Sequence, residues 1–189
     1  MGELILVLVV LFVLPGIAVV LTYNRFVAQV ASIDATWSGI DVELQRRHDL
    51  VDNLVRTVEG YADHERSTLD AVTNARSRAV QATSSEVPVE DQARAEDALT
   101  EGLSSLLAIS EDFPDLKADR AFRDLQRQLV ETEDRITASR RLYNLEVAAY
   151  ERRRRSFPSN LVAGLFNFAQ RELFEIQDAG AKHAAQVSW

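Results

Sequence analysis

Cysteine is absent from this 189-residue chain, and lysine is almost absent. Without a thiol, the protein has no disulfide, no thiolate nucleophile and no cysteine ligand for a metal. Lys117 and Lys182 are the only lysines, so 19 of the 21 basic residues are arginines. The 29 acidic residues give a net charge of −8. This acidity argues against a nucleic-acid-binding surface, and we expect no nucleic acid partner.

Motifs of catalysis are also missing. The seven glycines are scattered, so no phosphate-binding loop is present, and no G-x-S-x-G elbow occurs. The stretch "HERST" from His64 resembles the start of a zinc-protease helix, but Thr68 stands where the second histidine is needed. We therefore expect no enzymatic activity, and we assign no catalytic, cofactor-binding or metal-ligating residue.

One long apolar run is present, "LILVLVVLFVLPGIAVVL" at residues 4–21. Its 18 residues are about the minimum that crosses a hydrocarbon core of roughly 30 Å as a helix. A cleaved signal peptide is the alternative, since Pro15 could break the run. However, Glu3 replaces a positive n-region, and no small-x-small cleavage site precedes Tyr23. We predict a retained membrane anchor at residues 1–22 that contacts lipid.

The flanking charges predict how the anchor is oriented. No basic residue precedes the run, whereas Arg25, Arg46 and Arg47 follow it. Basic residues beside a span tend to stay in the cytoplasm. We therefore expect a single-pass protein of the cell membrane with its N-terminus outside and its C-terminal domain in the cytoplasm.

After the anchor, apolar residues recur at steps of three and four, which is the pattern of a coiled coil or helical bundle. In the first soluble segment they are Phe26, Val30, Ile33, Trp37, Ile40, Leu44, Val51, Leu54, Val58 and Tyr61. This helix extends to about Thr83 unless it bends or breaks at Gly60.

Two further helices show the same spacing. The second begins near residue 88 and carries Ala95, Leu99, Gly102, Leu106 and Ile109. Pro114 stops it, and Asp115 or Asp119 is placed to cap the third helix. The third presents Phe122, Leu125, Leu129, Ile136, Tyr143, Val147 and Tyr150.

Pro158 closes the third helix, and the segment after it predicts an amphipathic last helix. Its broad apolar face consists of Leu161, Val162, Leu165, Phe166, Phe168, Leu173 and Ile176. No segment has the period of a strand. We predict an all-α fold with an N-terminal transmembrane helix, an antiparallel bundle at residues 23–177 and a flexible tail at residues 178–189.

Four charged residues fall on the apolar seams: Arg47, Glu65, Glu133 and Arg140. Arg47 and Glu65 are 18 residues apart, roughly 27 Å along a helix, but Glu133 and Arg140 are only roughly 10 Å apart. Straight helices therefore allow one direct pair, such as Arg47 with Glu133. We expect these residues to fix the helix register rather than to bind a ligand.

The run Arg152, Arg153, Arg154 and Arg155 has two interpretations. It is a favourable solvated helix end, because cations stabilise the negative C-terminal pole of a helix. It is also a candidate contact with anionic lipid, together with Phe166 and Phe168. The sequence favours neither.

Several stretches together resemble the LemA family. They are "YNRFV" from Tyr23, "IDVELQRRHDLVDNLV" from Ile40, "VEGYADHE" from Val58, "FPDLKAD" from Phe113, "LVETEDRI" from Leu129, "RRLYN" from Arg140 and "FPSNLVAGLFNF" from Phe157. The resemblance covers about residues 23–175. This chain departs from it at Val51 and Asp52, where the family usually has Ile-Pro, so a break near Asp49 is in doubt.

The resemblance implies a single-pass membrane protein with an antiparallel helical bundle and no established catalytic residues. It also suggests a membrane partner such as a metalloprotease. We therefore expect a LemA-like scaffold that forms a homo-oligomer or binds a membrane protein. The alternatives are a membrane-remodelling or lipid-sensing protein, and a regulator or accessory subunit of a membrane metalloprotease.

Overall fold

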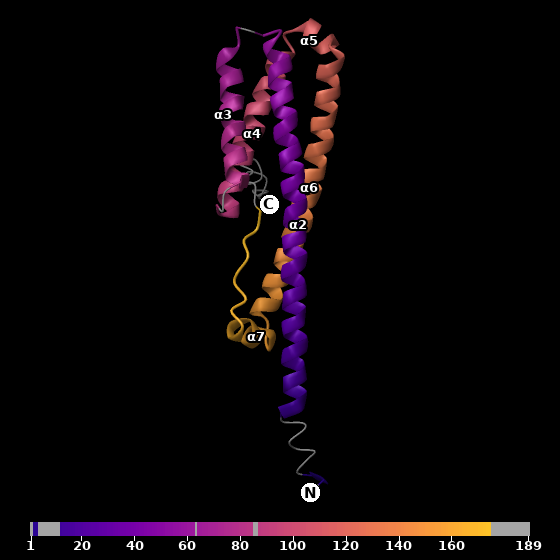
Figure 1. Ribbon diagram of the computed structural model, residues 1–189, viewed down its shortest axis with the longest axis vertical. Coiled ribbons are helices and arrows are strands. Elements are labelled where there is room, and N and C mark those ends of the chain that lie inside the picture. The colour runs from indigo at the N-terminus through magenta and orange to yellow at the C-terminus, as the bar shows by residue number, and fades with distance from the viewer. Residues whose placement is uncertain (1, 4–11, 63, 85–86, 175–189) are drawn as a thin grey trace, which may run out of the picture. The chain divides into compact units, whose positions relative to one another are not determined.

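A computed structural model describes residues 2–3, 12–62, 64–84 and 87–174 of the chain (Figure 1). These residues contain no strand, which confirms the all-α class. The helices are α2 (Leu14–Glu59), α3 (Arg66–Ser84), α4 (Val89–Ser110), α5 (Pro114–Ala118), α6 (Arg120–Arg155) and α7 (Ser159–Leu165).

The chain divides into two compact units. The anchor unit comprises residues 1–39 and 141–173, and the bundle unit comprises residues 40–140 and 174–189. The 4–11 part of the predicted span and the predicted tail at residues 178–189 lie outside the described residues.

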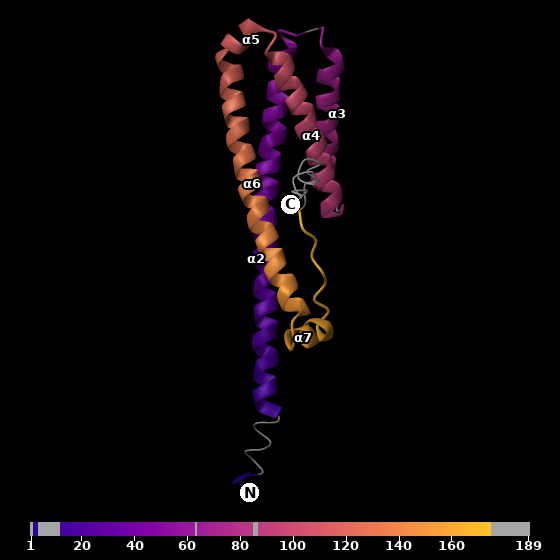
Figure 2. The ribbon, with the colours of Figure 1, turned by 180° about the vertical axis from the view of Figure 1, so that it is seen from behind.

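In the bundle unit, the apolar seams of α2, α3, α4 and α6 form one core. Figures 1 and 2 both show α3 and α4 side by side. Its deeply buried large side chains include Val51, Leu54, Val58, Val72, Leu99, Leu106, Leu116 and Phe122. Burying a large aliphatic or aromatic side chain contributes about 1.5–3 kcal/mol. The spacing of three and four residues stabilises the bundle, because it places these apolar side chains on the buried side of each helix.

The predicted seam of α4 is correct at Leu99 and Leu106, but at Ala95, Gly102 and Ile109 the buried residue is the next one along the chain. The buried stripe passes through Leu99, Leu103 and Leu106 and continues backwards to Glu96, while Ala95 lies on its edge. Gly102 belongs to the edge as well, where an added Cβ would lie 3.4 Å from Val72 Cγ2. The missing side chain at Gly102 lets α3 approach α4 closely at Val72.

The break in the first long helix falls at Gly60. Helix α2 continues through Asp49 and ends at Glu59, and a turn then leads into α3. In the turn, the Tyr61 and Ala62 amides both donate to the Val58 carbonyl at 2.9 Å. Glycine is a poor helix former, and ending α2 there lets α3 return alongside the core. Consequently Glu65 lies in the turn and not on a helix seam, which corrects its predicted position.

In the anchor unit, the first part of α2 packs against the end of α6. Phe26 and Ile33 are buried from α2, as predicted. The seven-residue series on α6 places Tyr143 and Tyr150 against them, and both are buried. The Trp37 ring lies 5.1 Å from the Tyr143 ring, measured between centroids.

Helix α7 is much shorter than the predicted amphipathic helix. It ends at Leu165, and the chain continues without helix to Phe174. Asn167 adopts a left-handed conformation with φ 54°, and the Phe168 amide donates to the Ala163 carbonyl at 2.9 Å. These are the features of a Schellman ending, which stops a helix. The prediction that Leu173 continues the helical stripe is therefore wrong.

Helix α2 is the one described helix that is long and apolar enough to cross a membrane. Its first turns expose Leu14, Ile17, Val20 and Leu21. Exposed apolar side chains in this position are expected for a surface that faces lipid.

Replacing Asp119 with alanine tests the predicted cap of α6. Asp119 Oδ1 accepts hydrogen bonds from the Ala121 and Phe122 amides at 2.7 and 3.1 Å, and Tyr61 Oη donates to Oδ2 at 2.9 Å. The Phe122 amide and then Tyr61 lower the pKa of this carboxyl. The cap therefore stabilises the fold above the ordinary carboxyl pKa, and this contribution is lost as pH falls through the lowered value.

We expect Asp119→Ala to lower the melting temperature at neutral pH and to leave it nearly unchanged at a pH where Asp119 is protonated. Thermal unfolding followed by circular dichroism measures both. Asp115→Ala, in the first turn of α5, is the control. An equal loss at both pH values would contradict the role of the charged cap.

Candidate functional site

A cluster of charged side chains is buried inside the bundle unit. Arg47 and His48 come from α2 and Glu96 from α4, and all three are almost completely inaccessible to solvent. Arg47 Nη1 donates to Glu96 Oε2 at 3.0 Å, and His48 Nε2 lies 2.7 Å from Glu96 Oε1. One carboxylate thus uses both oxygens to hold two adjacent residues of α2.

Arg47 makes two further contacts. Its Nη2 donates to Thr100 Oγ1 at 2.5 Å, one helical turn after Glu96. Its Nε lies 2.8 Å from Glu133 Oε1 of α6, although the two groups are not aligned for a hydrogen bond. The pair of Arg47 with Glu133 is the one that the seam spacing allowed. Arg47 therefore connects α2 to both α4 and α6.

Glu133 and Arg140 extend the cluster along α6. Partial burial raises the pKa of Glu133, and the Arg47 and Arg140 charges oppose that rise. Burial lowers the pKa of Arg140, and repulsion from Arg47 adds to this effect. The Arg140 guanidinium lies 4.3 Å from the centre of the Phe174 ring, a cation–π contact. Its Nε and Nη2 are buried and have no hydrogen-bond partner among the described residues.

His48 is also fixed through its main chain. Arg76 Nε of α3 donates to the His48 carbonyl at 2.7 Å, and Arg76 Nη1 lies 3.4 Å from Asp52. His48 Nδ1 has no hydrogen-bond partner in the described part of the chain. A ring protonated on Nε2 therefore donates to Glu96, which leaves Nδ1 unprotonated in the neutral form.

This geometry suits the fixing of helix positions better than chemistry. Both oxygens of Glu96 are engaged, so it is not free to act as a base. Within the described ranges no group of three or more metal-ligating side chains occurs. A buried pair that loses one member leaves an unpaired charge, which penalises any shift of α2 against α4. That register role remains a prediction.

The sequence pattern did not predict His48 or Glu96 as members of the cluster. Glu96 could have been predicted, because it lies three residues before Leu99 on the buried stripe of α4. His48 had no such signal, since it is next to Arg47 and only the angle between α2 and α4 brings both side chains to one carboxylate.

The predicted membrane-contact residues separate into two groups within the anchor unit. Arg153 Nη1 donates to Gln29 Oε1 at 2.7 Å, Arg154 binds Glu151 at 3.0 Å, and Phe168 stacks on Phe26 with centroids 4.7 Å apart. These three therefore stabilise the unit. Arg152 and Arg155 are exposed, and Phe166 is partly exposed. Only this second group is available to a membrane surface.

The LemA family model matches residues 36–189 of the chain. Magnetosome protein MamQ 2 of Paramagnetospirillum magneticum is 27% identical over 199 aligned positions, which cover 93% of this chain and 73% of that protein. Magnetosome protein MamQ of Magnetospirillum gryphiswaldense is 26% identical over 180 positions, covering 84% of this chain and 66% of the relative. The match of the family model over most of its length, together with the all-α bundle, shows that the chain belongs to the LemA family.

Proposed function

We propose that the protein is a membrane-anchored scaffold that self-associates through the outward face of α6. Membership of the LemA family, similarity to magnetosome proteins and the apolar start of α2 support a LemA-like, membrane-associated protein. The placement of the domain on the cytoplasmic side of the cell membrane is part of the proposal, and it follows from the basic residues after the span.

The observation that carries the proposal is an unpartnered apolar stripe on α6 within the anchor unit. Leu142, Leu145 and Ala149 are exposed at steps of three and four. They lie on the opposite side of the helix from Tyr143 and Val147, which are buried. This spacing is the one by which helices pair in coiled coils.

A second copy of the chain is the partner that best fits the stripe. Arg141 and Glu146 flank it on opposite sides of the helix, as their spacing requires. Opposite charges beside an apolar seam favour pairing with a like helix, because each arginine then meets a glutamate of the other copy. The same stripe would suit a similar helix of another membrane protein.

The pair of substitutions Leu142→Ser and Leu145→Ser tests self-association. Burial of a leucine contributes about 1.5–3 kcal/mol, and about 1.4 kcal/mol is a tenfold change in affinity. We expect the double variant to associate at least about a hundredfold more weakly. The protein mass in detergent measures this, and crosslinking in native membranes checks it.

Val130→Ser is the matched control. Val130 is 62% exposed and Leu145 is 63% exposed, and both are on α6, but Val130 lies off the stripe. The control should associate like the parent protein. A parent protein that is monomeric in membranes, or a double variant with unchanged mass, would overturn the proposal. Crosslinking to a different protein, such as a membrane metalloprotease, would replace the second copy with that partner.

A further inference from the structure

We propose that the corner between α6 and α7 inserts into the lipid interface beside the anchor. At this corner, Phe157, Leu161 and Leu165 are 81%, 63% and 71% exposed. Val162 and Ala163, on the other side of α7, are buried in the protein. The helix therefore presents two large leucines outward, and the described residues of the anchor unit leave both largely exposed.

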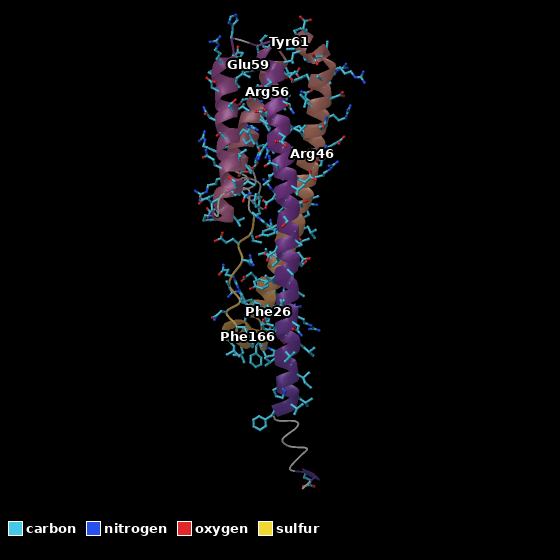
Figure 3. The ribbon with its side chains drawn as sticks, in the orientation of Figure 1. Phe26, Arg46, Arg56, Glu59, Tyr61 and Phe166 are labelled. Carbon is cyan, nitrogen blue, oxygen red and sulfur yellow. The ribbon has the colours of Figure 1, made fainter. Side chains whose placement is uncertain are left out.

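Aromatic contacts hold this corner next to the end of the predicted span. The Phe166 ring lies 4.8 Å from the Tyr23 ring, and the Phe168 ring lies 4.7 Å from the Phe26 ring. Figure 3 shows Phe166 close to Phe26 along α2. Tyr23 follows Leu21 by two residues, roughly 3 Å along the helix. Phe166 is consequently at the level where the anchor leaves the hydrocarbon.

Lipid is the occupant that this position favours. The ring of Tyr23, two residues after the exposed Leu21, contacts the ring of Phe166, which directly follows α7, so a membrane that receives the start of α2 also reaches α7. Interfacial helices bury their apolar face about 5–10 Å into the boundary between headgroups and acyl chains. Tyrosine is a common residue at that boundary, and Tyr23 occupies it here.

The charges near the corner fit the same surface. Arg152 and Arg155 are exposed in the last turn of α6, although Arg155 Nε also lies 3.4 Å from Glu151 Oε2. Arg153 and Arg154 are less exposed and bind Gln29 and Glu151. Two exposed guanidinium groups near an apolar face are suited to anionic headgroups. Thus half of the arginine run contacts lipid and the other half stabilises the protein.

The absence of native cysteine allows a direct test with the full-length chain. Leu161→Cys and Leu165→Cys, each labelled with a polarity-sensitive fluorophore, are reconstituted in vesicles of phosphatidylcholine that contain nitroxide-labelled lipid. Val130→Cys is the control, since Val130 is 62% exposed and belongs to the bundle unit. We expect quenching by shallow nitroxides at both leucine positions and several-fold lower access of iodide than at Val130.

Three results would overturn the proposal. One is equal access of iodide to Leu161 and Val130. Another is protection that rises with the protein-to-lipid ratio, since a second copy would then cover α7. The third is a loss of protection at Leu161 when Leu142→Ser and Leu145→Ser are also present. The proposed insertion does not depend on self-association, so protection should persist in that variant. Retained protection in that variant supports the inference even if the scaffold proposal fails.

A second experiment tests the contribution of Arg152 and Arg155 to lipid binding. When these arginines are unchanged, adding phosphatidylglycerol to the vesicles should move the label at Leu161 to a less polar environment. The shift should be lost when Arg152→Ser and Arg155→Ser are present, and kept when Arg127→Ser, another exposed arginine of α6, is present. A response to phosphatidylglycerol that survives removal of Arg152 and Arg155 would contradict their role.

Discussion

Replacing Glu96 with alanine should destabilise the protein by about 3–5 kcal/mol, the range seen when one member of a buried ion pair is removed. Glu96 is fully buried and is the shared partner of Arg47 and His48. Its loss leaves the Arg47 guanidinium inside the bundle with the Thr100 hydroxyl and the partly exposed Glu133 carboxylate as its remaining contacts. Thermal unfolding should show a fall in Tm of roughly 10 °C for a domain of this size.

Glu90→Ala is the matched control for this result. Glu90 is also on α4 and pairs with Arg94, but both side chains are exposed. Exposed pairs contribute about 0–1 kcal/mol, so the control should melt close to the parent protein. A Glu96→Ala variant that melts like Glu90→Ala would show that the cluster is not needed for stability.

A double substitution distinguishes two contributions to the free energy of unfolding. One is the penalty for leaving Arg47 unpaired, and the other is the stabilisation by the pair of Arg47 with Glu96. Arg47→Met combined with Glu96→Leu replaces both charges with apolar groups of similar length. Such replacements of buried pairs are often neutral or stabilising. We expect the double variant to recover most of the stability lost in Glu96→Ala. If it recovers stability but changes the self-association measured by mass in detergent, the cluster serves to fix register.

The second large effect is expected at Phe26. Phe26→Ala should cost about 3–5 kcal/mol, the range for large aromatic residues in well-packed cores. Phe26 is fully buried, stacks on Phe168 and meets the edge of the Tyr150 ring at 5.9 Å between centroids. The cavity would remove the support for the segment that follows α7.

Hydrogen exchange provides a local measurement of this effect. Residues 166–173 should exchange faster in Phe26→Ala, while α3 and α4 in the bundle unit should change least. Val27→Ala is the control, because Val27 is the next residue and is exposed. Uniform acceleration over the whole chain would contradict a local role of Phe26 and indicate a general loss of stability.

The long helices were predictable because burial along them follows a simple period. On α6, Phe122, Leu129, Ile136, Tyr143 and Tyr150 are seven residues apart, and all are buried. Five apolar residues at a constant spacing of seven show clearly which side of the helix faces a partner. The sequence left Asp115 and Asp119 open as caps of the third helix, and the structure shows that Asp119 is the cap of α6.

Shorter or less regular signals were misleading. In α4, the stripe through Gly102 and the stripe through Leu103 fit the apolar spacing about equally well. The sequence therefore did not show which of the two is buried. After Pro158, Phe166 and Phe168 continued a helical pattern, but their rings bind Tyr23 and Phe26 from far away in the sequence. Asn167 is the local signal for the end of α7, because asparagine accepts the left-handed conformation that closes a helix.

The sharing of one carboxylate between neighbouring residues also constrains how this sequence evolves. An ancestor that exchanged Glu96 for an apolar residue first would pass through a poorly folded intermediate, and so would one that removed Arg47 first. We therefore expect relatives to keep Arg47 and Glu96 together or to lose them together. Across a set of related sequences these two positions should vary jointly, and sequences that keep only one of the two charges should be rare.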